Sequence, residues 1–157
     1  MGLIPMKGGS PPMTIIPFSV LTKASRDELS HLLACNDGLS LYGYALTPGD
    51  AQALIDHKNQ CLADNQRIEF GDSILNSLID TFLDSPYLDH RNFLDTLHEL
   101  TTLFYSLKDI GDGLISDKSL LDFMKTLYDD RCGGDLQYLG DLASRLLEKQ
   151  LNSHPSH

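Results

Sequence analysis

Apolar residues recur every three or four positions along most of this chain, which is the spacing of one face of an α-helix. The clearest stretch follows Asp89, where the apolar positions step by four, three, four and three residues. This spacing predicts the longest helix of the protein, with one apolar seam that packs against neighbouring helices. The seam consists of Phe93, Leu97, Leu100, Phe104 and Leu107.

Helix-capping residues divide this pattern into six helices joined by short turns. A Ser, Thr or Asp placed before an apolar period can accept a hydrogen bond from an amide of the first helical turn. Thr47 is the strongest of these signals, because Pro48 follows it directly and Asp50 adds an acid to the first turn. The other predicted caps are Ser25, Asp89, Ser116 and Asp135, and a further helix is predicted over about residues 72–84.

The segments between these helices carry turn residues. Asn36-Asp37-Gly38 predicts a break, and residues 39–46 predict an extended segment or one irregular turn. Cys132-Gly133-Gly134 predicts the turn before the last helix. The helix over about residues 72–84 is the most hydrophobic segment, so we expect it at the centre of the core.

The two ends of the chain differ from the middle. Residues 1–12 are rich in glycine and proline and show no helical period, which predicts a disordered lead, with Met13 as an alternative start. An apolar arm follows and is expected to extend along the body. We expect one helical domain over residues 13–151 and a frayed tail over residues 152–157. No apolar run resembles a secretory signal or reaches the about 18 residues of a membrane-spanning helix.

The apolar composition indicates a purely helical fold. The chain has 29 Leu and 9 Ile but a single Val. Leucine loses little side-chain freedom in a helix, whereas β-branched residues are favoured in strands. Composition and periodicity together predict an all-α protein, a compact bundle of about six short helices with an extended N-terminal arm.

The charge balance excludes two classes of partner. Acidic residues number 22 against 12 basic ones, for a net charge of −10. Nucleic acids and anionic lipids are bound through Lys and Arg, so we expect neither as a partner. Half of the net charge falls in residues 47–84. This segment is either a solvated face or a docking face for a basic protein.

Cysteine and histidine spacings do not complete a known site. The three cysteines are Cys35, Cys61 and Cys132. Their odd number and wide spacing argue against disulfides and for a reducing, cytoplasmic location. His57 and Cys61 share a helix face, as do Asp95 and His98, but neither pair has the further ligands that a metal needs. No glycine-rich phosphate loop occurs, so we expect no metal and no cofactor.

Four residues are the candidates for a functional surface or groove. Arg67, Glu69 and Tyr87 lie in the linkers that bracket the predicted central helix. They either cap and bridge neighbouring helices or line a groove. Cys132 is either a buried thiol in a glycine turn or a nucleophile beside a helix N-terminus, where its pKa would be lowered.

Four short motifs carry a family resemblance. They are Tyr-Gly-Tyr-Ala-Leu-Thr at 42–47, Arg-Ile-Glu-Phe-Gly at 67–71, Asp-Ser-Pro-Tyr at 84–87 and Cys-Gly-Gly at 132–134. In this order they resemble a bacterial family, domain of unknown function 6323, over about residues 20–150. The resemblance implies a small, acidic, cytoplasmic helical protein and supplies no catalytic or ligand-binding residue.

Three hypotheses for the function follow. The first is a non-enzymatic protein-interaction or regulatory module, with a protein partner or a second copy of the chain. The alternative is a small hydrolase or ligand-binding protein with an interhelical pocket, using Cys132. A third, an acidic mimic of nucleic acid, requires the negative charges to form a continuous stripe.

Overall fold

The computed structural model describes residues 23–69, 73–111 and 113–153. The predicted disordered lead, the apolar arm and residues 154–157 of the predicted tail lie outside this part of the chain. Residues 152 and 153 belong to the last helix.

The six predicted helices are all present, and the all-α fold is confirmed for the described residues. The structure adds a four-residue helix and a 3-10 turn within residues 36–42, where the sequence indicated a break and an irregular segment. The elements are α1 (Lys23–Leu33), α2 (Asn36–Leu39), η2 (Ser40–Tyr42), α3 (Pro48–Asp64), α4 (Ile74–Phe82), α5 (Phe93–Gly111), α6 (Asp117–Asp130) and α7 (Leu136–Ser153).

Three predicted caps are confirmed. The Thr47 hydroxyl accepts from the Asp50 amide at 3.0 Å, and the Asp50 carboxylate accepts from the Thr47 amide at 3.0 Å. The Ser116 hydroxyl accepts from the Ser119 amide at 3.1 Å. These contacts satisfy amide groups that a helix leaves without an internal partner.

The third cap, Asp135, accepts from the Tyr138 amide at 3.0 Å. Two predicted caps were wrong. Helix α1 begins at Lys23, so Ser25 lies inside its first turn. Asp89 accepts from the amides of Arg91 and Asn92 and so closes the turn before α5, three residues too early to cap it.

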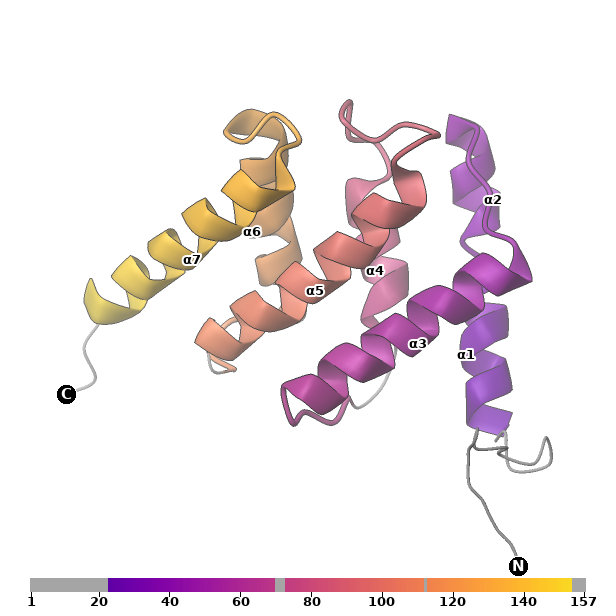
Figure 1. The fold of residues 1–157 in the computed structure, drawn as a ribbon, viewed down its shortest axis with the longest axis horizontal. Coiled ribbons are helices and arrows are strands. Elements are labelled where there is room, and N and C mark those ends of the chain that lie inside the picture. Colours follow the sequence, from indigo (N-terminus) through magenta and orange to yellow (C-terminus); the bar gives the residue numbers. More distant parts are fainter. Residues whose placement is uncertain (1–22, 70–72, 112, 154–157) are drawn as a thin grey trace, which may run out of the picture.

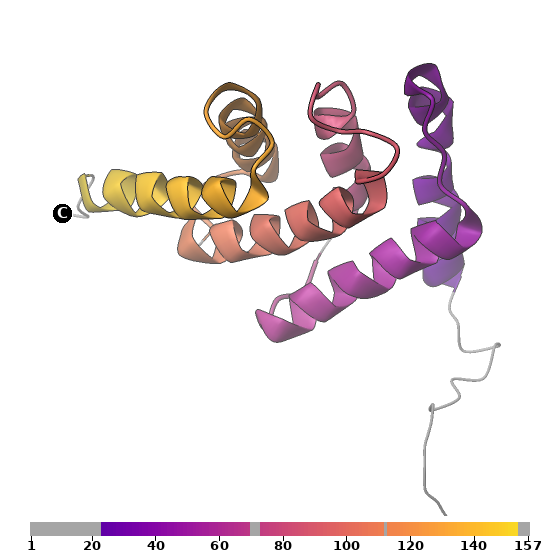
Figure 2. The ribbon, with the colours of Figure 1, turned by 45° about the horizontal axis from the view of Figure 1, so that its top comes forward.

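The helices form two layers of stacked hairpins. In Figures 1 and 2, α3, α5 and α7 run side by side in one layer, and α1, α4 and α6 lie behind them in the other. Helices α1 and α3 form the first pair, α4 and α5 the second, and α6 and α7 the third. Among the described residues, the first and third pairs make no extensive contact, because the second pair lies between them.

The helices of the second and third hairpins begin at the same spacing, although α4 has 9 residues and α6 has 14. Helix α6 begins 43 residues after α4, and α7 begins 43 residues after α5. What recurs is the spacing of the helix starts, since the apolar residues of α4, such as Ile74 and Phe82, correspond at this spacing to charged residues of α6, Asp117 and Lys125. Stacked hairpins of this kind make each unit depend on its neighbours for burial.

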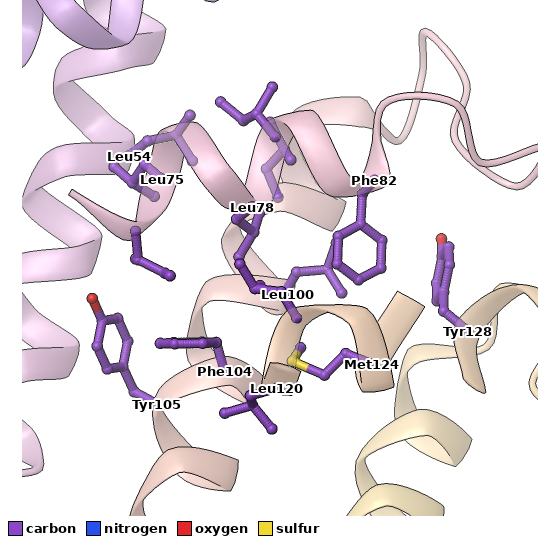
Figure 3. Close-up of a cluster of buried hydrophobic side chains, with 14 of the residues drawn as sticks. Leu54, Leu75, Leu78, Phe82, Leu100, Phe104, Tyr105, Leu120, Met124 and Tyr128 are labelled. Carbon is purple, nitrogen blue, oxygen red and sulfur yellow. The ribbon is translucent and has the colours of Figure 1, made fainter. Parts of the chain in front are cut away.

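The core lies between the two layers (Figure 3). The predicted seam of α5 is confirmed, since each of its five residues is at most 5% exposed. Helix α4 is central as predicted, with every apolar side chain of Ile74–Phe82 buried. Phe82 meets the Tyr128 ring edge-on, with ring centres 5.5 Å apart, which joins α4 to α6. Among the described helices, none has the length and apolar character needed to cross a membrane.

Candidate functional site

An open groove of about 650 Å³ lies between the first half of α5 and the start of α7. Its long wall is α5, and its other wall is formed by the turn before α7 and the first residues of that helix. Both walls are fixed by extensive packing of α5 against α7. The lining residues are Asn92, Asp95, Thr96, Glu99, Thr102, Leu103, Gly134, Leu136 and Gln137.

The groove is acidic, and one of its two carboxylates, Asp95, interacts electrostatically with His98 on the same helix. Asp95 and Glu99 lie one helical turn apart and are exposed. Neither forms an ion pair or hydrogen bond with another described residue. Among the described residues, no Lys or Arg lines the groove. By contrast, the described Lys and Arg side chains nearest the core, such as Lys58 and Lys125, are each paired with two carboxylates.

Thr96 forms part of the groove floor and has an unused hydroxyl. Its side chain is only 4% exposed, and its hydroxyl bonds no described residue. The fully enclosed side-chain atoms without a partner are Arg67 Nε and Asn76 Oδ1, and the Thr96 oxygen is not among them. The small exposed area of Thr96 therefore includes its hydroxyl, which opens into the groove.

The wall beside α7 is held by a close backbone approach. Gly134 has a φ of +84°, and a Cβ at this position would lie 2.6 Å from the Cβ of Tyr87. Only glycine accommodates both the positive φ and the close approach of the Tyr87 side chain. Asn92 donates to the Tyr87 carbonyl at 3.2 Å and also lines the groove. The sequence motifs at 84–87 and 132–134 therefore meet and shape one wall.

The turn that carries Tyr87 is anchored to α6. The buried Ser85 hydroxyl donates to the Asp129 carboxylate at 2.7 Å and accepts from the Tyr87 amide at 3.2 Å. Lys125 lies 2.7 Å from Asp84 and 3.0 Å from Asp129. The hydrogen bond from Lys125 lowers the pKa of Asp84. Sequence reasoning placed Tyr87 in a linker but could not identify these partners.

The motif at 42–47 supports the same turn from the other side. The Tyr44 hydroxyl donates to the Leu88 carbonyl at 2.7 Å, and its ring stacks on Phe93 with centres 4.6 Å apart. Gly43, with a φ of +81°, leaves room for the His90 ring. Three of the four family motifs thus gather along one edge of the hairpin stack, at the top of Figure 1.

Glu69 lies at the opposite edge, in a polar network. Lys58 is 4% exposed and pairs with Glu28 and, at 3.2 Å, with Glu69. The other Glu69 oxygen accepts from the Tyr105 hydroxyl at 2.5 Å. Burial and this carboxylate raise the pKa of Tyr105, so it stays a donor. The network joins α1, α3, α5 and the linker after α3.

Arg67 acts at the end of α5. Its guanidinium donates to the Lys108 carbonyl at 3.2 Å and lies 3.9 Å from the Asp109 carboxylate. A cation at this position complements the negative end of the helix dipole. Arg67 and Glu69 therefore bridge neighbouring helices, and the structure separates them from Tyr87 and Cys132.

A second polar cluster joins α3 to α5. The His57 Nε2 atom lies 2.8 Å from the Thr102 hydroxyl and 3.1 Å from the His98 carbonyl. The Cys61 thiol is 3.7 Å from the same nitrogen. Burial raises the pKa of Cys61 and, together with His57, lowers that of His98. Among the described residues, no three His, Cys, Asp or Glu side chains are arranged to hold a metal ion.

Cys132 is buried in the turn before α7. Its side chain is 7% exposed, and burial followed by Asp135 raises its pKa. A thiol nucleophile needs a lowered pKa and a nearby base. No histidine hydrogen bonds this thiol in the described part of the chain. The environment is that of a structural cysteine.

Sequence reasoning did not single out the groove. The sequence pairs Asp95 with His98 as half of a metal site and does not single out Glu99 or Thr96. The available signal is an acidic pair four residues apart on one predicted helix. The predicted acidic segment 47–84 has most of its carboxylates engaged in caps or local pairs, such as Asp50, Glu69 and Asp84.

A family model described as "Family of unknown function (DUF6323)" matches residues 31–154. The search of curated proteins and the search of solved structures gave no match. The match covers most of the chain, including the motifs that surround the turn at Tyr87 and all lining residues of the groove. The chain belongs to the DUF6323 family.

Proposed function

We propose that this protein is a non-enzymatic interaction module that binds a protein partner in the groove between α5 and α7. The observation that carries the proposal is the groove itself. It holds two carboxylates that no described Lys or Arg pairs with, and a threonine hydroxyl that hydrogen bonds no described residue. In the free protein these polar groups are hydrated, so their exposure lowers its stability little. When a segment binds, they can form hydrogen bonds and ion pairs with it.

The dimensions of the groove support a short segment as the bound group. Its volume of about 650 Å³ falls within the range of sites that hold a small ligand or a few side chains. Leu103 and Leu136 add apolar surface to the polar lining. A groove of this size suits an extended or helical peptide of a larger partner.

The thiols support a non-enzymatic role. Burial raises the pKa of Cys35 to about 11 and also raises the pKa values of Cys61 and Cys132. All three are therefore protonated near neutral pH and poorly nucleophilic.

Site-specific photo-crosslinking tests the proposal. A photoreactive amino acid is placed at Gln137, in the groove, and in a second protein at Asp122, exposed on α6 in the other layer. Both proteins are expressed in the native host and irradiated. We expect a discrete adduct from position 137 and none from position 122. The absence of an adduct at 137, with the protein eluting as a monomer from host extract, would contradict the proposal.

A further inference from the structure

We propose that the groove between α5 and α7 recognises a basic segment of the partner, with an arginine side chain bridging Asp95 and Glu99. This inference rests on the proposed function and names the chemistry of the bound segment. Its grounds are the charge of the groove, the spacing of its acids and the hydroxyl of Thr96, a largely buried residue whose hydroxyl opens into the groove.

The charge of the groove selects a cation. Of the described side chains, two carboxylates and no basic group line it, and the chain as a whole carries a net charge of −10. An acidic segment would be repelled, and an apolar one would leave both carboxylates beside a surface that removes their water. A basic segment is attracted from a distance and pairs with them on arrival.

The spacing of the acids fits a guanidinium group. Residues four apart on a helix have their Cβ atoms about 5–6 Å apart, so Asp95 and Glu99 can contact one planar cation from two sides. Arginine carries five N–H donors in a fixed fork, whereas lysine presents a compact point charge. The aliphatic part of an arginine can lie on Leu103 or Leu136 while its head meets the carboxylates.

Thr96 supplies an observation independent of the acids. A threonine inside a helix commonly donates to the carbonyl four residues earlier. Thr101 does so to Leu97 at 2.8 Å, but the Thr96 hydroxyl makes no such bond. Thr96 is 4% exposed and lines the groove. In the sequence it lies between Asp95 and Glu99. Its hydroxyl is an acceptor for a further N–H of the same guanidinium.

Titration of the isotope-labelled full-length protein with a synthetic peptide tests this directly. The probe is a nine-residue peptide with three arginines, and the matched probe carries citrulline at the same three positions, which keeps the shape and removes the charge. We expect the arginine peptide to shift the amide signals of residues 92–103 and 134–137 in a saturable manner, and the citrulline peptide to leave them unchanged.

Two double variants with equal charge separate local binding from general attraction. Asp95→Asn with Glu99→Gln neutralises the groove, and Asp141→Asn with Glu148→Gln neutralises two exposed acids of α7 outside it. The groove variant loses two exposed charge pairs with the peptide and should therefore bind about tenfold more weakly. The α7 variant should change affinity less than about twofold. Thr96→Val, which keeps the side-chain shape, should weaken binding by a smaller factor.

Several results would overturn the inference. They are equal weakening in both double variants, shifts spread over the whole surface, equal binding of the citrulline peptide, or concentration-dependent shifts of the groove signals without peptide. The last result would identify a second copy of the chain as the occupant. If the crosslinked adduct at position 137 still forms after Asp95 and Glu99 are neutralised, the inference of a basic segment is refuted, whereas the proposed function is still supported. If the arginine peptide binds in the groove but no adduct forms in the host, the proposed function is refuted, whereas the groove's preference for a basic segment is supported.

Discussion

The close approach of Gly134 to Tyr87 gives the sharpest prediction about this fold. Gly134→Ala adds a Cβ that would lie 2.6 Å from the Tyr87 Cβ and 2.9 Å from its Cγ. The first of these atoms belongs to the main-chain end of the side chain and cannot swing away. The backbone must therefore move, and with it the wall of the groove.

The expected loss in the free energy of unfolding has two contributions. Comparing alanine at Gly133 and at Gly134, in the same turn, separates them. A left-handed conformation costs an alanine roughly 1–2 kcal/mol relative to glycine. Overpacking a tight contact adds about 1–3 kcal/mol. Gly133 has a φ of +56° and no neighbour within 4 Å, so Gly133→Ala carries only the first cost. We expect the alanine at 134 to lower the free energy of unfolding by about 1–3 kcal/mol more than the alanine at 133.

Urea unfolding followed by far-ultraviolet circular dichroism measures both variants, with the slope of the transition checked for constancy. Tyr87→Ala removes the Cγ contact but keeps the Cβ at 2.6 Å, so it should relieve Gly134→Ala only in part, whereas Tyr87→Gly removes both atoms and should relieve it further. In a double-mutant cycle, the alanine at 134 should therefore cost less in the Tyr87→Gly background. Equal losses at positions 133 and 134 would refute the close approach.

The remaining predictions concern buried charge, pH and the thiols. Lys58→Met leaves Glu28 and Glu69, whose side chains are 23% and 17% exposed, without their cation and should cost about 3 kcal/mol in urea unfolding. The control Lys118→Met removes an exposed pair on α6 and should cost less than about 0.5 kcal/mol; similar losses would mean that the Lys58 network contributes little. Burial followed by His57 lowers the pKa of His98 below 6.5, so the unfolded chain takes up this proton first as the pH falls. Stability should then decline as the pH falls through 6.5 and below, less so in His98→Gln, and an unchanged slope in that variant would count against the shift. Because its pKa is raised, Cys132 should react with iodoacetamide far more slowly in the native protein than in urea. Peptide mass mapping measures both rates, and equal rates would make Cys132 a candidate nucleophile again.

The sequence predicted the helices well because their signals are local. Thr47, Ser116 and Asp135 cap the helices predicted for them, since a cap and its amide partner lie two or three residues apart. The seam of α5 was equally readable from its spacing. The failures at Ser25 and Asp89 have a local cause too: several polar residues compete near each start, and the same Asp that can cap a helix can also close the turn before it.

The site could not be predicted in the same way. Tyr87 and Gly134 are far apart in sequence, and so are Tyr44 and Leu88, yet each pair is in contact. A short motif does not indicate which other motif it will meet. The four motifs that carried the family resemblance therefore divide between two edges of the stack, three around the turn at Tyr87 and one beside Lys58 and Tyr105.

The sequence alone determined the class of this protein: all-α, with six main helices, an acidic surface and a leucine-rich core. Helix formation and burial depend on spacing and composition, which a single chain displays directly. Only the tertiary structure decided that the helices stack as hairpins and that most acids of residues 47–84 are engaged locally. It also placed Asp95, Glu99 and Thr96 in a groove against α7, where no described Lys or Arg pairs with the two acids. Whether a carboxylate is paired depends on which distant residues the packing brings beside it, and that information appears only once the helices are in contact.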